Sequence, residues 1–499
     1  MKILKILAID LGASSGRAIL GILSKSKKLS LEEIYRFPNE GIQVNNELHW
    51  DVPYLFNEIK NALITYVKKY GSNLNSIGVD TWGVNFILLD NDNRFLSPMY
   101  HYRDKRTVGM LEKMFKIVPK EEIFKQTGIQ FLELNSSTQL FSMIYNKSPR
   151  LPMTKTIIMF PDYINYLLSG IIACEFSDAT TTQLFNPMKK EWAYDLIKRL
   201  GLNPEWFIKV IPGGTVLGSI NKDEADEVGL NSNTKIIAPL THDTGSAYVS
   251  VPVDMDKYFE GEYGILSSGT WSLLGVELKD PLINAKALKY NYSNEGGING
   301  TIRFLKNITG LWLIQECKKI WDKEGLKLNW DEIAMEAENA DDFNSFINPD
   351  DHSFLAPSNM ILAIQDYCRN TEQKVPETVG EISRTIFESI TFRYKQAVEN
   401  LEDIIEKRLK ILYIIGGGSQ YDLLNQFTAN ILNIPVKAGP SEATVIGNIL
   451  VQALALGEVK DLIELREIVR DSFEIKNFLP ENHEKWKEAY FTYLDRTKK

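Results

Sequence analysis

The chain contains few of the residues that build disulfide frameworks, metal clusters or membrane spans. Its three cysteines, Cys174, Cys317 and Cys368, lie far apart, so we expect buried, inert thiols. No uninterrupted apolar run is long enough to cross a bilayer, and we expect neither a membrane partner nor a signal peptide ahead of the first strand. The sequence therefore predicts a cytoplasmic protein.

A surplus of positive charge is also missing. The chain has 56 Lys and Arg against 65 Asp and Glu, which gives a net charge of −9 at pH 7. This balance argues against nucleic acid as a partner, although a local positive pocket could still bind a small anionic substrate. The patterns G-x-x-x-x-G-K-[ST] and G-x-G-x-x-G are absent, so the sequence does not support a P-loop NTPase or a Rossmann dehydrogenase.

A chain of 499 residues is too long for one hydrophobic core and predicts at least two domains. We place these domains at residues 1–250 and 251–457, followed by a helical extension over 458–499. Strand patterns alternate with helix patterns, which predicts a mixed α/β fold. The acidic stretch 331–351 is expected at the surface. Strands are expected at 6–9, 18–24, 31–37, 76–80, 85–89 and 411–415, a second α/β unit from about 258, and helices at 53–69, 311–321 and 377–406.

Two turns of small residues, half a chain apart, form the most informative pattern. The segment Asp10-Leu11-Gly12-Ala13-Ser14-Ser15-Gly16-Arg17 follows an apolar strand, and Leu266-Ser267-Ser268-Gly269-Thr270-Trp271 repeats this arrangement. Glycine lets the backbone approach phosphate oxygens, while amides and hydroxyls in such turns supply donors. Each turn alone could be an ordinary hairpin, but the pair predicts a nucleoside triphosphate held between two lobes. Asp10 could then contact Mg²⁺ through water, because Mg²⁺ dehydrates reluctantly.

Another candidate site follows the apolar run 236–240. Asp243, in His242-Asp243-Thr244, could accept the proton of an attacking hydroxyl during phosphoryl transfer. The alternative is that Asp243 caps a helix that begins near Thr244, and that His242 is a hydrogen-bonded structural histidine. Local sequence favours this alternative.

Three further segments carry polar or small residues. In Asp80-Thr81-Trp82-Gly83, Trp82 could face a sugar ring and Gly83 could let a ligand touch the backbone, unless Trp82 is a core residue. The glycines of 416–420 follow a buried strand and could support a flat ligand, or could form only a tight turn. The charged loop 102–106 is expected to form solvated ion pairs.

Taken in order, these segments resemble the FGGY carbohydrate kinases over roughly residues 6–457. The resemblance implies an α/β, two-domain actin-like (ribonuclease-H-like) ATPase fold with a cleft between the domains. It assigns sugar binding, the first phosphate turn and the catalytic base to residues 1–250, and ATP binding to residues 251–457. Further segments that match in order are His49-Trp50-Asp51, Asn294-Glu295-Gly296-Gly297, Arg303-Phe304-Leu305-Lys306-Asn307-Ile308, Gly310-Leu311-Trp312-Leu313 and Glu442-Ala443-Thr444.

The resemblance also implies an activity. It implies transfer of the γ-phosphoryl group of ATP, with Mg²⁺, to the 1-hydroxyl of a ketose, and within the family it points to L-rhamnulose. L-fuculose or a xylulose is the alternative substrate. A more remote alternative is an actin-like ATPase that phosphorylates no small molecule. We expect a monomer or a homodimer.

Individual residues match the functional positions of the family. Asp243 resembles the catalytic base, and Asp10 resembles the carboxylate that reaches Mg²⁺ through water. The positions that resemble sugar-binding residues are Gly83, His242, Thr244 and Asn307. The positions that resemble ATP-binding residues are Ala13, Ser14, Ser15, Gly16, Arg17, Thr270, Gln315 and Gly417.

Asn85 departs from the family pattern, which has aspartate after Trp82-Gly83-Val84. An amide keeps one acceptor oxygen, loses the charge and gains donors. If this position orients the sugar, the preferred ketose would shift. If Asn85 only begins the next strand, the change has little effect, and we favour this interpretation because 86–89 has the pattern of a strand interior.

Overall fold

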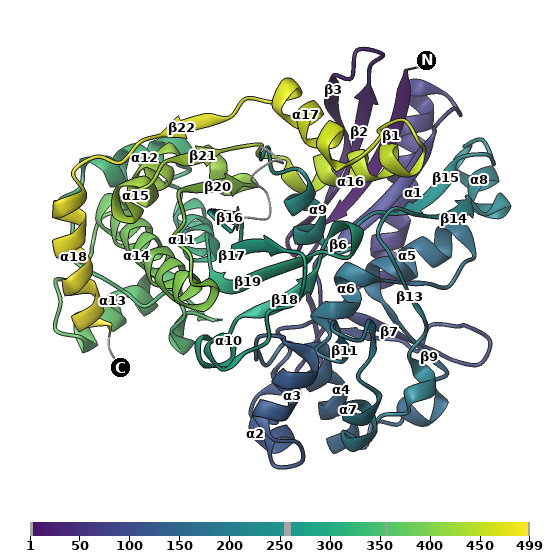
Figure 1. Cartoon of the computed structure of the whole chain (residues 1–499), viewed down its shortest axis with the longest axis horizontal. Helices are drawn as coiled ribbons and strands as arrows, with labels where there is room; N and C mark the ends of the chain where they lie inside the picture. The colour runs from purple at the N-terminus through teal and green to yellow at the C-terminus, as the bar shows by residue number, and fades with distance from the viewer. Residues whose placement is uncertain (1–2, 254–260, 356, 498–499) are drawn as a thin grey trace. The chain divides into compact units, whose positions relative to one another are not determined.

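The computed structural model describes residues 3–253, 261–355 and 357–497. The described chain forms two compact units, which are traced in Figure 1, and each unit combines segments that are distant in sequence. The first unit contains Met1–Met255, Glu277–Phe304 and Ala443–Ser472, and the second contains Asp256–Val276, Leu305–Glu442 and Phe473–Lys499. The units are thus interleaved along the chain, whereas the division into 1–250, 251–457 and 458–499 uses consecutive segments.

A six-stranded mixed sheet forms the centre of the first unit. Its strand order is β14-β15-β6-β1-β2-β3. These strands span Leu4–Leu11 (β1), Ser15–Leu23 (β2), Leu29–Pro38 (β3), Ser76–Thr81 (β6), Thr215–Ser219 (β14) and Lys235–Ala238 (β15). β1 is antiparallel to β2 and parallel to β6, and the register places Asp10 between Arg17 and Asp80. Pairing therefore brings these three charged residues to one end of the sheet.

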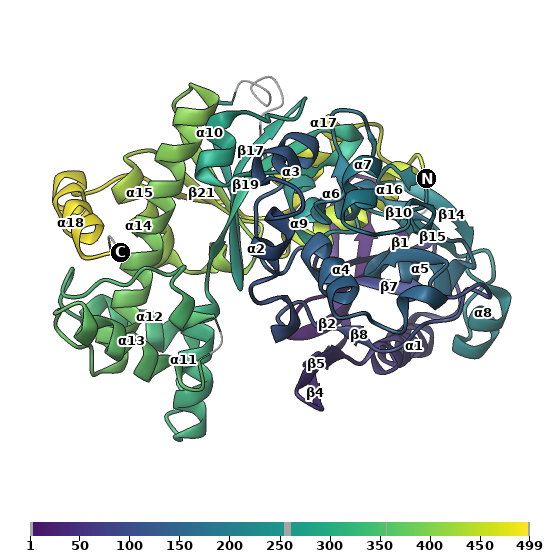
Figure 2. The ribbon, with the colours of Figure 1, turned by 90° about the horizontal axis from the view of Figure 1, so that it is seen from below.

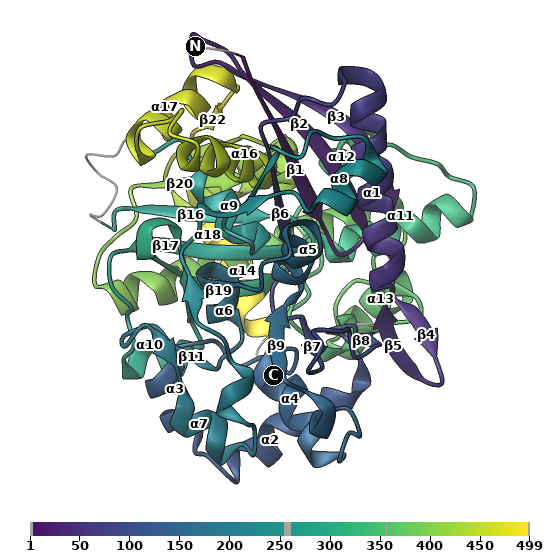
Figure 3. The ribbon, with the colours of Figure 1, turned by 90° about the vertical axis from the view of Figure 1, so that its right-hand side faces the viewer.

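Helices cover both faces of β1. On one face, alternate residues of β1 pack against α1 (Val52–Tyr70), which lies beside β2 and β3 in Figure 3. α1 begins where the Asp51 carboxylate accepts a hydrogen bond from the Tyr54 amide, which satisfies one of the free donors of the first turn. On the other face lies α16 (Ala443–Ala455), drawn in yellow beside β1 in Figure 1.

A glycine lets α16 approach α9 (Asp243–Val249), the helix that begins at the candidate base. A Cβ atom on Gly447 would lie 1.8 Å from the carbonyl oxygen of Ser246. A side chain of any size at 447 would therefore push the two helices apart.

Shorter elements surround this sheet. The remaining strands of the first unit pair as β4-β5-β8, β7-β9, β10-β13 and β11-β12. They span Ile42–Val44 (β4), Glu47–Trp50 (β5), Phe86–Leu89 (β7), Met99–Tyr100 (β8), Thr156–Met159 (β9), Cys174–Glu175 (β10), Phe185–Asn186 (β11), Glu191–Trp192 (β12) and Val210–Ile211 (β13). The other helices are α2 (Met110–Phe115), α3 (Lys120–Thr127), α4 (Ser136–Tyr145), α5 (Phe160–Ser169), α6 (Phe176–Thr181), α7 (Tyr194–Arg199), α8 (Lys222–Val228), α10 (Ala285–Tyr290) and α17 (Leu462–Ser472).

The second unit is built on a sheet with the order β18-β19-β17-β16-β20-β21-β22, and the boundary between the units runs within β17 and β19. The strands of this sheet are Tyr263–Ser268 (β16), Trp271–Leu278 (β17), Ser293–Gly296 (β18), Ile302–Thr309 (β19), Ile411–Ile415 (β20), Val436–Ala438 (β21) and Lys476–Phe478 (β22), of which β18 belongs to the first unit. The helices of the second unit are α11 (Trp312–Lys323), α12 (Trp330–Asn339), α13 (Met360–Asn370), α14 (Val379–Ile405), α15 (Asp422–Leu432) and α18 (His483–Arg496). Figure 2 shows α11, α12 and α13 grouped beside α14.

The expected strands and helices are confirmed, most of them with longer bounds. α14, expected at 377–406, buries a stripe of apolar residues that includes Ile382, Ile386 and Ile390, and it begins with a capping box in which Thr378 and Glu381 satisfy each other's backbone amides. The second α/β unit was expected to open at about residue 258, and the part of that opening before residue 261 lies outside the described residues.

The expectation that 331–351 lies at the surface is correct for its acidic residues and wrong for its apolar ones. The stretch 331–351 contains most of α12, which buries Ile333 and Ala337 and packs on α14, and it also contains the buried residues Phe346 and Ile347. The acidic residues there occupy only the outer face of this helix and its flanks. In the extension after 457, α17 is amphipathic: it exposes Glu467 and buries the side chain of Arg466 completely.

Among the residues that the structure describes, no helix is both long and apolar enough to cross a membrane.

Candidate active site

The loop between β15 and α9 continues the central sheet of the first unit. The Thr81 amide donates to the carbonyl oxygen of Thr241 at 2.9 Å, and Thr81 forms a parallel bridge with His242. His242 is the N-cap residue of α9, and Asp243 is its first residue. The cap position thus belongs to His242, while the Asp243 carboxylate accepts a hydrogen bond from the Thr244 hydroxyl at 3.1 Å.

Glu175, which the sequence analysis missed, holds this loop in place. Its Oε2 atom accepts from the amide and hydroxyl of Thr241, at 3.0 and 3.1 Å, and from the amide of Ser177 at 2.9 Å. The Ser177 hydroxyl accepts in turn from the His242 amide at 3.1 Å. The two residues before Asp243 are therefore fixed by a fully buried carboxylate. A buried acid at the end of a two-residue strand has no sequence signature, because only folding brings it to the loop.

Burial makes Asp243 a stronger base than an ordinary aspartate. Removal from water raises the pKa of Asp243 to about 7, and the negative charge of Asp10 adds to this effect. Hydrogen bonds from Thr244 and the charge of Arg303 act in the opposite direction. A carboxylate with a pKa near neutrality suits general-base catalysis.

Asp80 shares this environment and was predicted only as part of a strand end. Burial, and then the charge of Asp10, raise the pKa of Asp80 well above its usual value. Asn448 of α16 donates to one oxygen of Asp80. Asp80 is completely buried, so it lies beneath the surface that a substrate could reach.

Gly83 and His242 are in close contact. A Cβ atom on Gly83 would lie 3.1 Å from Nε2 of His242 and 3.1 Å from Cγ2 of Thr181, so the absence of a side chain keeps this spot open. The predicted sugar-binding positions Gly83, His242 and Thr244 thus cluster with Asp243 in the first unit, while Asn307 lies on β19 in the second. Trp82 belongs to the hydrophobic core, as the core alternative predicted, and its ring centroid lies 4.2 Å from that of Trp50 with the rings tilted.

Asn85 is the centre of a buried polar network rather than a simple strand start. Its Oδ1 accepts from the indole N–H groups of Trp82 and Trp50, at 2.7 and 3.1 Å, and its Nδ2 donates to the carbonyl oxygen of Tyr100 at 2.9 Å. Because an indole N–H can only donate, the amide oxygen must face the two tryptophans and the NH₂ group must face Tyr100. An aspartate would lack that donor.

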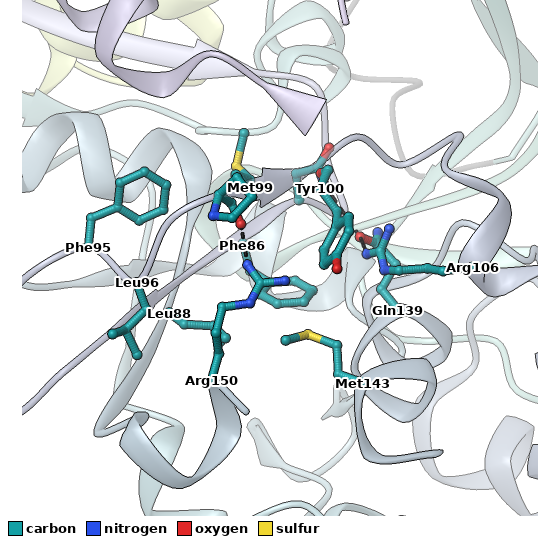
Figure 4. Close-up of a pocket in the computed structure, with 12 residues that line it drawn as sticks. Phe86, Leu88, Phe95, Leu96, Met99, Tyr100, Arg106, Gln139, Met143 and Arg150 are labelled. Atoms are coloured by element: carbon teal, nitrogen blue, oxygen red, sulfur yellow. Dashed lines mark hydrogen bonds between the residues drawn. The ribbon is translucent and has the colours of Figure 1, made fainter. Parts of the chain in front are cut away.

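The network continues into a small cavity, shown in Figure 4. Arg106 donates to Oε1 of Gln139 at 2.8 Å, and Tyr100 lies between the guanidinium groups of Arg106 and Arg150. The free volume is about 10 Å³, which is close to the minimum for one water molecule. The expectation of solvated ion pairs in the loop 102–106 is wrong for the pair of Arg106 with Asp104, because Asp104 is buried, the Arg106 side chain is only 11% exposed, and desolvation lowers the pKa of Arg106 to about 10.

The first phosphate-type turn connects β1 and β2. The Gly12 amide closes the turn on the carbonyl oxygen of Ser15 at 2.9 Å, and Arg17 forms an ion pair with Asp10. Within the described part of the chain, the backbone amides of Ala13 and Ser14 have no hydrogen-bond partner. These amides, with the hydroxyls of Ser14 and Ser15, are available donors for a phosphate group.

The second phosphate-type turn connects β16 and β17 in the second unit. The Thr270 hydroxyl donates to Oε1 of Gln315 at 3.1 Å, so two of the predicted ATP-binding residues are joined. Gly417 begins the turn after β20, and a Cβ atom there would meet nothing within 4 Å. The adjacent Gly418 packs against Ser268 at the end of β16, so the glycine turn and the hairpin lie side by side.

The chain matches known families over nearly its whole length. The N-terminal domain of the FGGY family of carbohydrate kinases matches residues 5–250, and the C-terminal domain of the same family matches residues 264–456. The sequence is 42% identical over 486 residues to a rhamnulokinase of Bacteroides thetaiotaomicron, covering 97% of this chain and 98% of that protein. It is 40% identical over 475 residues to a rhamnulokinase of Bacillus subtilis, covering 95% of each chain.

Solved structures show the same fold at low sequence identity. A ligand-bound xylulose kinase from Lactobacillus acidophilus superposes with a TM-score of 0.81 at 16% identity, covering 98% of this chain and 97% of that one. Plasmodium falciparum glycerol kinase with ADP gives a TM-score of 0.78 at 15% identity, covering 99% and 98%. The predicted two-domain actin-like fold is confirmed. With both family domains matched in order, the chain belongs to the FGGY family of carbohydrate kinases.

Proposed function

We propose that this protein transfers the γ-phosphoryl group of ATP to the 1-hydroxyl of L-rhamnulose. The observation that carries the chemistry is Asp243, a partly buried carboxylate with a pKa of about 7 at the start of α9, beside His242 and Gly83. The substrate is supported by relatives named rhamnulokinase that are about 40% identical over almost the entire chain.

In the proposed reaction Asp243 accepts the proton of the sugar hydroxyl as that oxygen attacks phosphorus. A base of this kind accounts for only part of the rate, because positioning and charge neutralisation dominate phosphoryl transfer. His242, Thr244 and Gly83 would orient the sugar beside Asp243, and Asn307 of the second unit stays a predicted sugar-binding residue. Closing water out of this site would suppress hydrolysis of ATP in the absence of sugar.

The two hairpin turns would bind the nucleotide. In the first turn the free amides of Ala13 and Ser14 fit phosphate oxygens, with Ser15, Gly16 and Arg17 completing the turn. In the second unit Thr270, Gln315 and the open backbone at Gly417 stay the predicted ATP-binding residues.

Mg²⁺ would be held by the phosphates and by Asp10 through water. Among the described residues no group of three or more His, Cys, Asp or Glu could hold a metal by itself. Mg²⁺ is usually bound by one or two carboxylates together with substrate phosphates, and Asp10 at the end of β1 fits that role. When bound, the ion would neutralise charge on the transferring phosphoryl group.

The test is release of ADP from ATP and Mg²⁺ with L-rhamnulose, L-fuculose, L-xylulose, D-xylulose and glycerol, each over a range of concentrations. We expect the highest kcat/KM with L-rhamnulose, and product analysis should place the phosphate on the 1-hydroxyl. A higher kcat/KM for another sugar would overturn the substrate assignment and leave the kinase activity standing. ATP hydrolysis that no sugar stimulates would overturn both.

A further inference from the structure

Arg303 of β19 is a buried cation that contacts the site from behind His242. Its side chain is completely buried in the first unit. The Nε atom donates to the carbonyl oxygen of Gly296 at 2.8 Å, and one terminal nitrogen lies 3.1 Å from Nδ1 of His242. The other terminal nitrogen lies 3.3 Å from Oε2 of Glu295. The Arg303 guanidinium therefore lies between the Glu295 carboxylate and the His242 imidazole.

These contacts determine which nitrogen of His242 carries the proton. A guanidinium has only donors and keeps its charge inside proteins, so the nitrogen at 3.1 Å from it must accept. The Glu295 carboxylate is 3.6 Å from the same nitrogen, which is too far for a hydrogen bond. Nδ1 of His242 is thus unprotonated, and in a neutral imidazole the proton then lies on Nε2.

The Nε2 atom faces the site. It lies 3.4 Å from Oδ1 of Asp243 and next to the open space at Gly83. A proton on Nε2 would give this nitrogen a hydrogen bond to donate, either to the carboxylate or to an oxygen of a bound sugar. The other tautomer would present a lone pair at Nε2, which repels the carboxylate and can only accept a hydrogen bond from a sugar hydroxyl.

We propose that Arg303 is a positioning residue that holds His242 as the neutral Nε2–H tautomer, so that His242 donates toward Asp243 and the sugar. The sugar part of this inference rests on the proposed function, whereas the tautomer does not. Arg303 acts here through His242 and contacts no substrate itself.

A second consequence concerns charge beside the base. Burial and the positive charge of Arg303 keep the pKa of His242 well below its usual value, so the imidazole stays neutral. An imidazolium next to Asp243 would pair with the carboxylate that must accept the proton. The charged groups around His242 are Arg303, Glu295 and Asp243, and Glu295 balances the charge of Arg303 within the buried cluster.

The tautomer can be measured directly, because the chain has only five histidines. In protein labelled with ¹⁵N-histidine, long-range proton–nitrogen correlation spectra distinguish the two neutral tautomers and the cation. His242→Gln assigns the signal. At neutral pH and without ligands, we expect His242 to show the Nε2–H pattern. An Nδ1–H pattern or a cation in the unmodified protein would overturn the proposal.

Substitution of Arg303 supplies the causal test. Arg303→Met should change the His242 pattern, either to a tautomer mixture or to the cation, while Glu295→Gln is the matched control that should preserve it. The double variant Arg303→Met/Glu295→Gln removes both charges and keeps the test valid if the single variant fails to fold. An unchanged Nε2–H pattern in the folded Arg303→Met or double variant would overturn the proposal.

Kinetic measurements distinguish a positioning role of Arg303 from a general loss of activity in the variant. Loss of the oriented donor should reduce kcat/KM for the sugar by about ten- to a hundredfold, with little change in the KM for ATP. Glutamine at 242 donates without help from Arg303, so Arg303→Met should have little further effect in a His242→Gln background. Equal effects of Arg303→Met in both backgrounds would mean that Arg303 does not act through His242. The tautomer of His242 is measured in ligand-free protein, whereas the proposed function is tested with the panel of sugars. The tautomer proposal can therefore fail while the proposed function holds, and the reverse is also true.

Discussion

The two phosphate-type turns have the same hairpin plan and differ in charge. In each, a glycine amide closes the turn at 2.9 Å, from Gly12 to Ser15 and from Gly269 to Trp271. The first turn ends in the ion pair between Arg17 and Asp10. The second carries no ion pair among its described residues, and it is fixed by amides at the start of α11 that donate to the carbonyl oxygens of residues 269 and 270.

This difference extends to the regions around the turns. Asp10, Asp80 and Asp243 interact electrostatically at the end of the first sheet, and burial raises the pKa values of Asp80 and Asp243. Beside the second turn the predicted ATP-binding residues are the neutral Thr270, Gln315 and Gly417. The same local backbone therefore supports a charged site where proton transfer is proposed, and a neutral one where only binding is proposed.

Removing the charge of Asp243 should have the largest effect on activity. We expect Asp243→Asn to reduce kcat by about 10²- to 10⁴-fold, because the amide cannot accept the sugar proton. A neutral amide is easier to bury than a carboxylate, so the melting temperature should not fall. Steady-state kinetics and thermal unfolding would measure the two effects, and calorimetry with a non-hydrolysable ATP analogue should show nearly unchanged binding. Residual turnover within tenfold of the unmodified protein would remove Asp243 from the proposed role.

The pH dependence of kcat/KM should be set by Asp243, in the charged region around the first turn, and not by the neutral second turn. Only ionised Asp243 accepts a proton, so kcat/KM should fall about tenfold per pH unit as the pH drops below about 7. The folded state binds this proton more tightly than the unfolded chain does, so the same acidification should not destabilise the protein through Asp243. The loss should therefore be reversible. Thr270→Val, in the neutral turn, should keep the same acid limb, and a shifted limb in that variant would contradict the assignment.

One substitution in each turn compares how a charged residue and a neutral residue contribute to ATP binding. Arg17→Met leaves Asp10 without its partner, and we expect the KM for ATP to rise by about ten- to a hundredfold. Thr270→Val removes one neutral hydrogen bond to Gln315, and the rise should be about two- to tenfold. ATP saturation curves at a fixed sugar concentration would measure both. Equal effects would show that the charge difference between the turns has no consequence for nucleotide binding.

Asn85→Asp adds a charge to the buried network of the first unit and should have the smallest effect. The aspartate can still accept from Trp50 and Trp82, but it cannot donate to the carbonyl oxygen of Tyr100. We expect a loss of about 1–3 kcal/mol in the free energy of unfolding, measured by denaturant titration. Asn73→Asp, at an exposed position in the same unit, is the matched control. Unchanged stability with an altered sugar preference would mean that residue 85 contacts the substrate.

Local pattern was enough to predict much of the fold. The helices expected at 53–69 and 377–406 are α1 and α14, and their buried apolar residues recur every three or four positions, as Leu55, Ile59 and Leu63 do in α1. The buried face of α12 within 331–351 was missed because charged residues there outnumber Ile333 and Ala337, which alone are buried in that helix. Burial of a helix depends on what packs against it, which local composition does not contain.

The candidate site was predicted in part. The motifs identified Asp243, His242 and Gly83, and folding brings these residues together. Glu175 and Arg303, which hold the loop and the imidazole, were not assigned such roles, because each acts on a residue more than 60 positions away. Similarly, Asn85 matters through Trp50 and Tyr100, and its sequence neighbours suggested only the start of a strand.

By itself, the sequence determined the α/β class, the two glycine turns and the residue types available for chemistry, because periodicity and turn composition act over a few neighbouring residues. The tertiary structure decided the protonation states of Asp243 and His242. Asp243 acquires a pKa of about 7 from burial and from Asp10, and the tautomer of His242 follows from a guanidinium on another strand. Desolvation and hydrogen bonding depend on what lies within a few ångströms, and only the folded chain defines those neighbours.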